Sequence, residues 1–428
     1  MYVDAKTLQP VRPRRGNARV PSTVVALGVV SLLTDVSSEA VVAVLPIYLT
    51  VVVGLSPVAY GVVDGLYQGV SAATRIPAGW LADRLDRPKW VAVVGYGLSA
   101  AAKALLLPAA GLAAITVVVT ADRIGKGLRT APRDSLITTA SDAATLGRNF
   151  GVHRAMDTVG AMLGPLMAFA LLALVPDGYD LVFLAAFASA LLGLAVLGLA
   201  VPDARTRPER ASRPARAAVP RPTLAALGGP WFVRVCVAAG ALALVTVSDG
   251  FLYLSLQERD DFAGVWFPLL FVGTSVTYLS LAVPLGRLAD RVGRMRVFVL
   301  GHLALLAAYL CVVGPVSGTV TTVLALLLLG TYYAATDGVL AAVAGAVVPA
   351  AHRATGIATV QTVVVVGRLL SSLLFGLVWT LGGNVVAVTV YAVGLAVMLP
   401  LAWWVLHRGE AAGTDGRPGA PAVRGAEA

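Results

Sequence analysis

Two acidic residues lie four positions apart in a long apolar stretch near the start of the chain. Asp35 and Glu39 are the charged residues between positions 22 and 50. At this spacing on a helix, the two side chains share one face. Carboxylates that close repel each other when both are ionised, and apolar surroundings oppose ionisation further. The pair would therefore favour holding a proton, or it would attract a cation.

Basic residues cluster on a second apolar stretch, over residues 112–136. Arg123, Lys126, Arg129 and Arg133 fall within a helical arc of about 120°, and Asp122 lies inside it. Such cations are costly in a membrane helix unless they face water, a partner or an anionic ligand. Arg129 and Arg133 could instead extend to the nearer membrane surface. Arg123 lies deeper, and we expect it to have a functional role.

Further acids inside apolar stretches are candidates for the same chemistry. They are Asp64, Asp157, Asp249 and Asp337. Asp249 follows a serine as Asp35 follows a threonine, which suggests corresponding positions in two related parts of the chain. His153 lies one helical turn before Asp157, so the two could pair. For any one acid the alternative is a structural pair with a buried base, and the available bases are Lys103, Arg123 and Arg368.

The composition indicates that membrane helices hold these residues. Hydrophobic residues make up 58% of the 428 residues and charged residues 13%, and the mean hydropathy is +0.82. A soluble domain carries about 25% charged residues. The apolar stretches are long enough to cross a hydrocarbon core about 30 Å thick. In lipid they should be helices, which satisfy every backbone group internally. Barrel strands are excluded, because they would be about 10 residues long and would alternate.

We expect an all-α membrane protein with twelve transmembrane helices in two six-helix halves. The expected spans are 22–50, 57–80, 90–110, 112–136, 149–174, 180–202, 230–256, 264–288, 297–315, 318–347, 355–380 and 384–406. The expected domains are a basic N-terminus (1–21), an N-terminal bundle (22–202), an Arg-, Pro- and Ala-rich linker (203–229), a C-terminal bundle (230–406) and a disordered tail (407–428). The first span is too long for a cleavable signal.

Basic residues in the loops predict the orientation. Lys and Arg gather before the first span and in every second loop after it, whereas the alternate loops hold almost none. The positive-inside rule therefore predicts that both termini lie in the cytoplasm and that the protein is in the cytoplasmic (inner) membrane. The net charge of +10 needs no nucleic-acid partner, because topology and anionic headgroups account for it.

A turn of the form Gly-x-x-x-Asp-Arg occurs at 79–84 and again, about half a chain later, at 286–291. Both turns resemble motif A of the major facilitator superfamily, and the resemblance covers nearly the whole chain. It implies a cytoplasmic latch between the halves that breaks when access changes. The implied gating residues are Gly79, Asp83, Arg84, Gly286, Asp290, Arg291 and Arg294. The first copy departs from the pattern at Asp86, where glycine is expected, and at Pro88, where a basic residue is usual.

Two further segments resemble motifs of the same family. Residues 123–127 resemble motif B, with Lys126 where Gln is common, and the motif implies a role for Arg123 in proton transfer. A motif C-like pattern, typical of members that export solutes in exchange for protons, is formed by Gly151, Gly160, Gly164 and Pro165. Its final Gly-Gly is absent. Helix packing and bending are the alternative reading of these residues.

The sequence thus predicts a secondary active transporter that works by alternating access. We expect proton-coupled export of a small organic or drug-like molecule by a monomer in the lipid bilayer. The candidates for proton coupling and substrate binding are Asp35, Glu39, Asp64, Arg123, Lys126, Asp157, Asp249, Asp337 and Arg368. Tyrosines that could line the cavity are Tyr253, Tyr278, Tyr332 and Tyr333. The most similar subgroup is a set of bacterial facilitators that largely lack an assigned substrate.

Other functions stay open or are disfavoured. Proton-coupled uptake, or uniport, of a small nutrient such as an anion is the main alternative, and a non-transporting sensor is a remote one. An enzyme would need a nucleophile and base or a metal cluster, and Cys236 and Cys311 offer neither a disulfide framework nor metal-ligand spacing. The hydrolase, zinc-protease and P-loop motifs are absent from the sequence. We therefore expect no enzyme, metal or cofactor.

Overall fold

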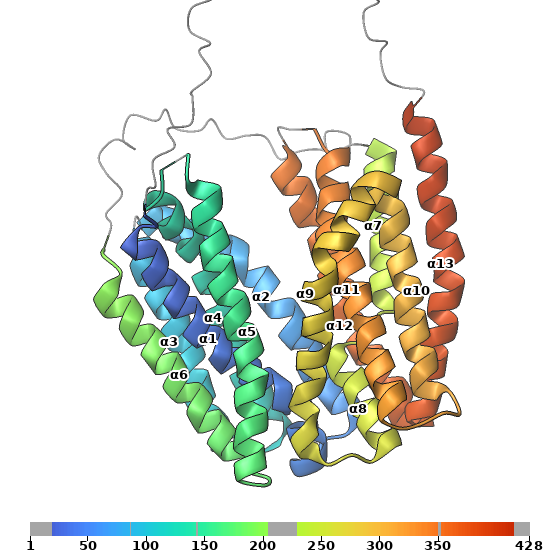
Figure 1. Cartoon of the computed structure of the whole chain (residues 1–428), viewed down its shortest axis with the longest axis horizontal. Coiled ribbons are helices and arrows are strands. Elements are labelled where there is room, and N and C mark those ends of the chain that lie inside the picture. The colour runs from blue at the N-terminus through green and yellow to red at the C-terminus, as the bar shows by residue number, and fades with distance from the viewer. Residues whose placement is uncertain (1–18, 86, 143, 204–228, 350–351, 415–428) are drawn as a thin grey trace, which may run out of the picture.

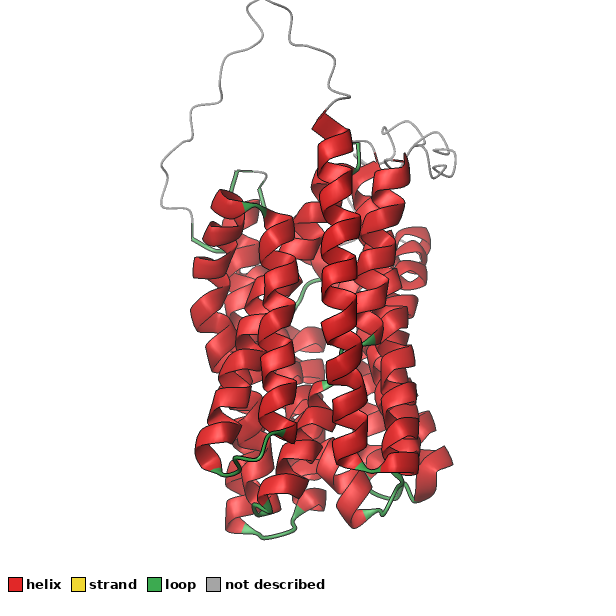
Figure 2. Ribbon diagram, turned by 90° about the vertical axis from the view of Figure 1, so that its right-hand side faces the viewer, coloured by secondary structure: helices red, strands yellow, loops and turns green. Residues whose placement is uncertain are grey.

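The computed structural model describes residues 19–85, 87–142, 144–203, 229–349 and 352–414, and these residues form helices and short connections without a strand. Figures 1 and 2 show the helices running side by side between the two ends of the molecule. The first six spans are α1 (Ser22–Ile47, continued by a π-helical turn at Tyr48–Val52), α2 (Pro57–Leu85), α3 (Pro88–Leu106), α4 (Gly111–Thr139), α5 (Leu146–Leu174) and α6 (Tyr179–Ala200).

The second part of the chain repeats this plan. Its helices are α7 (Gly229–Leu244), α8 (Asp249–Asp260), α9 (Phe267–Val292), α10 (Arg294–Val313), α11 (Thr319–Val347), α12 (Arg353–Gly382) and α13 (Asn384–Thr414), with a 3-10 turn at Gly264–Trp266 before α9. In the first half, α1 packs on α5 and α6, and α4 packs on α2 and α3. In the second, α11 packs on α9 and α10, and α7 packs on α12. The halves meet mainly where α2 contacts α12 and α5 contacts α9.

The buried charged side chains of the helices lie mostly in the first bundle. Within the described residues, nine helical stretches are long and apolar enough to cross a membrane by composition. Helices α2, α3 and α4 are not among the nine. The charged side chains of Lys103, Arg123 and Arg129 are nevertheless buried, while large apolar residues such as Leu199 are exposed. Polar groups facing inward and apolar groups facing outward are expected of spans in lipid. Counting α7 and α8 as one span gives twelve.

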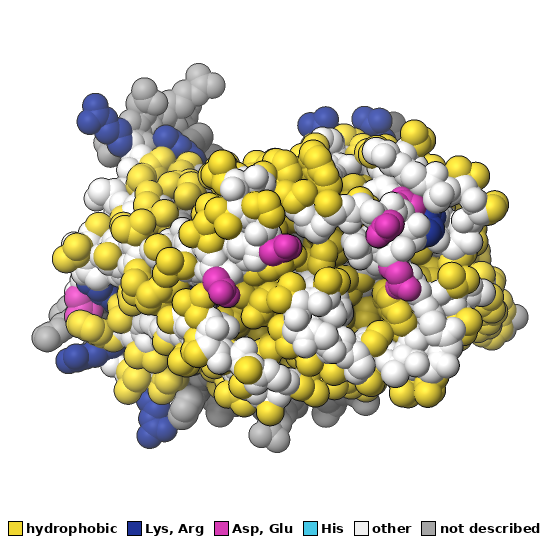
Figure 3. Space-filling model, turned by 90° about the horizontal axis from the view of Figure 1, so that it is seen from below, with side chains coloured by type: hydrophobic (Ala, Val, Ile, Leu, Met, Phe, Trp, Pro, Cys, Tyr) yellow, Lys and Arg dark blue, Asp and Glu magenta, His cyan; other side chains and the backbone are white. Residues whose placement is uncertain are grey.

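The end of the molecule that holds the α5–α6 and α8–α9 turns is mostly apolar. Figure 3 shows this end with acidic side chains scattered among hydrophobic ones. Arg259 lies here at the end of α8 and pairs with Asp260 at 2.9 Å, and Asp260 also accepts a hydrogen bond from Thr322 at 2.5 Å. The Thr322–Asp260 hydrogen bond ties α8 to α11 at this end of the molecule.

The seventh span differs from the single helix expected over 230–256. It breaks between α7 and α8, at Val245 to Ser248. Three of these four residues are β-branched, which lowers helix propensity. The freed backbone groups find partners: Tyr309 Oη accepts a hydrogen bond from Val247 N–H at 2.7 Å and donates one to Val245 O at 3.2 Å. Ser371 Oγ donates to Thr246 O at 2.7 Å. These tertiary contacts are not visible in a single-helix pattern.

Candidate functional site

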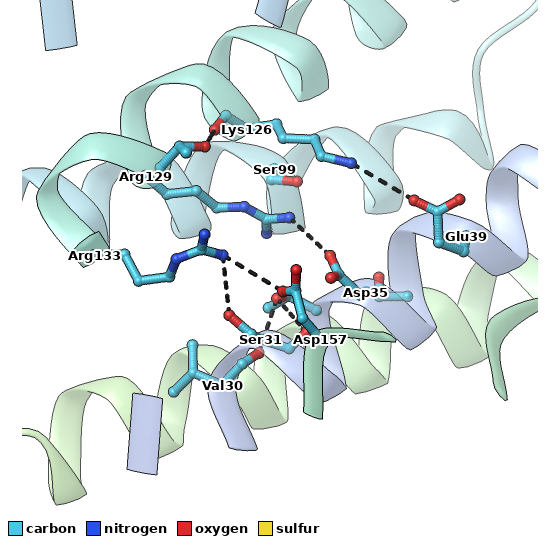
Figure 4. Close-up of polar contacts among 12 residues, drawn as sticks. Val30, Ser31, Asp35, Glu39, Ser99, Lys126, Arg129, Arg133 and Asp157 are labelled. Carbon is cyan, nitrogen blue, oxygen red and sulfur yellow. Dashed lines mark hydrogen bonds and ion pairs between the residues drawn. The ribbon is translucent and has the colours of Figure 1, made fainter. Parts of the chain in front are cut away.

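Helix α4 presents a row of bases to acids on α1 and α5. Lys126 Nζ lies 3.6 Å from Glu39, and Arg129 lies 3.6 Å from Asp35. One turn further along, Arg133 lies 3.6 Å from Asp157 of α5. Figure 4 shows these pairs side by side. The helical spacing of three and four residues on α4 matches the four-residue spacing of the two acids on α1, so neighbouring helices can pair in register.

Arg133 joins α1, α4 and α5 at one end of this row. Its guanidinium donates to Ser31 Oγ at 3.1 Å and lies 3.2 Å from Asp134. The Ser31 hydroxyl is also 3.0 Å from Nε2 of the buried His153. The expected pair of His153 with Asp157 is therefore not formed, because the imidazole faces α1 and Arg133 takes Asp157. Asp35 and Asp157 also interact electrostatically, and a proton on either would relieve their repulsion.

Burial distinguishes the three acids of the row. The Asp35 side chain is 14% exposed, compared with 27% for Glu39 and 26% for Asp157. Its partner Arg129 is buried and lies over the Tyr96 ring at 4.6 Å from the centroid. A charge pair with so little access to water is sensitive to the loss of either partner. Asp35 is accordingly the acid whose protonation would change this region most.

The row forms one wall of a cavity of about 510 Å³. The bases that line it are Lys126, Arg129, Arg133 and Arg154, and the acids are Asp35, Glu39, Asp134 and Asp157. Ser275 and Tyr278 of α9 complete the wall from the other half. Because acids and bases are balanced, protonation of any one acid leaves a net positive wall.

Arg123 lies apart from this cavity. It pairs with its neighbour Asp122, which also binds Lys103 Nζ at 2.7 Å and accepts a hydrogen bond from Ser99. The Arg123 guanidinium lies over the Tyr67 ring at 4.0 Å from its centroid. A small cavity of about 20 Å³ adjoins it. Asp122 is thus the shared acid of a buried cluster, a role that the sequence did not single out.

Two further candidate acids lie at the centre of the molecule, between the halves. Asp64 of α2 accepts a hydrogen bond from Ser372 of α12 at 2.5 Å, and Asp249 accepts one from Tyr333 at 2.5 Å. Both acids line a cavity of about 350 Å³ together with Glu39 and Arg368. Asp35 does not line it, so Asp249 and Asp35 face different cavities despite their similar sequence context.

A third cavity, of about 590 Å³, also lies between the halves. Arg154 of α5 and Arg368 of α12 line it, and Asp337 of α11 is the acid on its wall. Of the four candidate tyrosines, Tyr278 and Tyr332 line this cavity, Tyr333 lines the 350 Å³ cavity, and Tyr253 is buried with its hydroxyl donating to Thr274. Polar residues that the sequence analysis missed here are Gln68, Arg154, His302 and Gln361. A polar residue in an apolar span was the available signal.

Two of the three motif C-like glycines allow close helix contact. A Cβ at Gly160 would collide with the backbone of Leu32, and one at Gly164 would lie 2.8 Å from Val36 O. These positions let α5 approach α1, which carries Asp35 and Glu39. Gly151 faces open space, so its substitution would meet no steric barrier. Pro165 is buried inside α5.

The structure describes more side chains in the second motif A-like turn than in the first. The side chain of Asp83 lies outside the described residues, Gly79 approaches Ala131 of α4, and Arg84 is exposed. In the second copy, Asp290 pairs with Arg294 at 2.8 Å. In the same copy, Gly286 is partly buried and Arg291 is exposed. The described side chains thus show a pair within the second turn. Across the described ranges, His, Cys, Asp and Glu form no group suited to a metal ion.

Comparison with protein families gives one match that spans most of the chain. The sequence pattern of the Major Facilitator Superfamily matches residues 27–273 and 260–426. An uncharacterised MFS-type transporter of Methanocaldococcus jannaschii is 29% identical over 283 residues, which cover 65% of this chain and 68% of the relative. An uncharacterised protein of Mycobacterium tuberculosis is 35% identical over 156 residues, covering 36% of this chain and 38% of that protein.

Solved structures share the fold at low identity. The nucleoside transporter NupG aligns with a TM-score of 0.75 at 15% identity, covering 90% of this chain and 99% of NupG. A peptide transporter, POT, aligns with a TM-score of 0.75 at 17% identity, covering 94% of this chain and 97% of POT. A bacterial homologue of the lysosomal transporter Spinster, in an inward-facing conformation, gives 0.66 at 16% identity, with 92% and 96% covered. These matches support the twelve-helix fold and are transporters rather than enzymes.

Proposed function

This chain belongs to the major facilitator superfamily and is a multi-pass membrane transporter of that type, and we propose that it exports a small organic molecule in exchange for protons. The observation that carries this proposal is the row of acid–base pairs between α1, α4 and α5 on the wall of the 510 Å³ cavity. A charge row beside a solute-sized cavity lets a proton and a solute act on the same helices.

The coupling works through the pairs. Protonation of Asp35 removes the attraction that holds Arg129 to α1, and the arginine is then free to bind a solute group or another acid. Loss of this tie also weakens the contact between α1 and α4. Exchange requires that the inward and outward states differ in affinity for the proton and for the solute. A proton bound in the charge row and a solute bound in the adjoining 590 Å³ cavity, whose lining shares Arg154 and Tyr278 with the 510 Å³ cavity, act on the same helices and provide that difference.

The proposed orientation places both termini in the cytoplasm and the protein in the inner membrane, as one six-helix bundle over 22–202 and another over 230–406. Arg133 and Arg154 lie in the parts of α4 and α5 nearest the α4–α5 turn, which this orientation puts on the cytoplasmic side. At the opposite end, α2 and α12 are joined by Asp64–Ser372 and by Val58 N–H donating to Thr380 Oγ1 at 3.1 Å. We therefore assign the structure to an inward-facing state of a monomer.

The test is proton movement in inside-out vesicles with an acidified lumen. Addition of a transported compound to the outside, the cytoplasmic face, should let protons leave the lumen and dequench a pH-sensitive dye. Asp35→Asn should lower this signal by about tenfold or more, because a neutral amide cannot carry the proton. Asp180→Asn, at an exposed carboxylate at the start of α6, is the matched control. Transport by Asp35→Asn at the wild-type rate would remove Asp35 from the mechanism.

Uptake or uniport of a nutrient is the second candidate, and an anionic nutrient would suit Arg154 and Arg368, which line the 590 Å³ cavity and form no ion pair with a described residue. Direction separates it from export. An uptake system would move protons out of the acidified lumen only when the compound is loaded inside the vesicles, and a uniporter would move none. A sensor would bind the compound without any flux.

A further inference from the structure

Arg368 is a partly buried base that forms no ion pair with a described residue. It lies in the middle of α12, and its Nε atom is buried and has no hydrogen-bond partner among the described residues. Its recorded contact is with the face of Tyr333, at 5.9 Å from the ring centroid. A buried N–H donor without a partner is costly unless an acceptor reaches it.

Asp249 and Asp337 attract Arg368 electrostatically, but neither is within ion-pair distance of its guanidinium. Asp249 is hydrogen-bonded to the Tyr333 hydroxyl. Asp337 lines the 590 Å³ cavity with Arg368, and Arg154 approaches the same cavity from the other half. Arg154 is exposed to the cavity and likewise forms no ion pair with a described residue. Two bases and one acid leave the cavity with a net positive charge.

Aromatic rings lie beside these bases. Phe298, His302 and Tyr332 line the cavity and follow one another with centroid separations of 4.9 and 5.1 Å. Tyr333 continues the row at 5.1 Å from Tyr332. The volume of about 590 Å³ falls in the range of small-molecule pockets, about 300–1,000 Å³. Rings of this kind bind an apolar or aromatic body, whereas the guanidinium binds a carboxylate or phosphate through two parallel hydrogen bonds.

We infer that the transported solute is an organic anion whose carboxylate or phosphate group binds Arg368 in the 590 Å³ cavity. Its apolar body packs on the rings of Phe298, His302 and Tyr332, and Arg154 adds a second positive charge from the first half. Such a ligand contacts both halves at once, which favours their closure around it. This inference deepens the proposed function, because it takes the bound molecule to be the exported one.

The binding experiment uses four probes with one ring system. The probes are 1-naphthoate, 1-naphthyl phosphate, 1-naphthamide and 1-naphthylmethylamine, and the readout is the thermal unfolding midpoint of the purified full-length protein as each is titrated. One or both anions should raise the midpoint, and the amide and the amine should not. The first two probes distinguish a carboxylate solute from a phosphate solute. Equal stabilisation by the amide or amine, or no stabilisation by either anion, overturns the inference.

Substitutions of the two arginines test whether the anion binds in this cavity. Arg368→Gln should weaken binding of the anion by about tenfold or more, because it removes a charge-assisted bidentate contact. The anion affinity of Arg368→Lys should lie between those of the wild type and Arg368→Gln, since lysine keeps the charge and loses the planar fork. Arg154→Gln should weaken the anion by about threefold, as an exposed charge is worth less, and it tests the cavity even if Arg368→Gln does not fold. Arg234→Gln, at an exposed arginine on α7, is the control. Wild-type affinity in Arg368→Gln overturns the assignment.

The two proposals fail separately. Binding is measured without a proton gradient, so anion binding with no proton movement in vesicles would contradict exchange and leave the anion site intact. Proton movement driven by the amine, with no response to the anions, would leave exchange intact and contradict the anion site.

Discussion

At the residue scale, Asp122 is the acid whose removal should cost most stability. Its carboxylate is the partner of Lys103 and Arg123, whose side chains are each 3% exposed. Asp122→Asn would leave two buried cations with a neutral amide, and removing one partner of a buried pair costs about 3–5 kcal/mol. We expect a clear fall in the thermal unfolding midpoint of the purified protein.

The controls for this prediction separate charge from packing. Asp180→Asn, at an exposed carboxylate, should leave the midpoint unchanged. Adding Lys103→Met to Asp122→Asn should recover part of the loss, because one uncompensated cation is removed. A wild-type midpoint for Asp122→Asn would show that water or lipid headgroups reach these bases.

The same residues show what a sequence can predict about a site. Helical spacing places Asp35 and Glu39 on one face, and in the structure both line the 510 Å³ cavity. The spacing on α4 likewise groups Lys126, Arg129 and Arg133, although Arg123 turns to another neighbour. Periodicity fixes which residues share a face of one helix but not which faces of different helices meet. The partners of each acid therefore required the structure.

At the scale of elements, a tyrosine hydroxyl satisfies two of the backbone groups freed at the break between α7 and α8. Tyr309 Oη bonds both Val247 N–H and Val245 O. Tyr309→Phe should destabilise the protein by about 1–3 kcal/mol, because a buried backbone donor loses its partner. Tyr96→Phe is a matched control: Tyr96 is also buried, but its hydroxyl has no hydrogen-bond partner among the described residues, so the thermal unfolding midpoint of this variant should not fall. Equal effects of the two substitutions would show that water replaces the Tyr309 hydroxyl at the break.

The elements themselves were largely predictable. The expectation of twelve spans in two halves is confirmed by the family match and the solved neighbours. The lengths of the apolar stretches and the polar segments between them suffice to predict the spans, because lipid leaves few alternatives to a helix. The break at 245–248 was not predicted, since its stabilising groups, Tyr309 and Ser371, come from distant helices.

At the scale of the whole molecule, the repeated turn predicts two halves, but it does not reveal where they touch. Contact on the side away from the α4–α5 turn depends on glycines. A Cβ at Gly61 of α2 would collide with Ser372 O of α12, and one at Gly376 of α12 would collide with the backbone of Pro57. The residues that line the cavities between the halves, such as Arg154 and Arg368, come from segments far apart in sequence. No local pattern brings them together.

The final prediction tests whether this glycine contact is the closed gate of an inward-facing state. Gly61→Val should separate α2 from α12 and favour the outward-facing state, since α12 backbone cannot yield as a flexible side chain does. A cysteine placed at Gln68, which borders the central cavities, should then react several-fold faster with a membrane-impermeant thiol reagent added from the periplasmic side. Cys236 and Cys311 are first replaced by serine to remove their background. Gly198→Val, where a Cβ meets no atom within 4 Å, should leave the rate unchanged. Because the reagent reaches Gln68→Cys only through the gate, an unchanged rate in Gly61→Val would mean that α2 and α12 do not close that side.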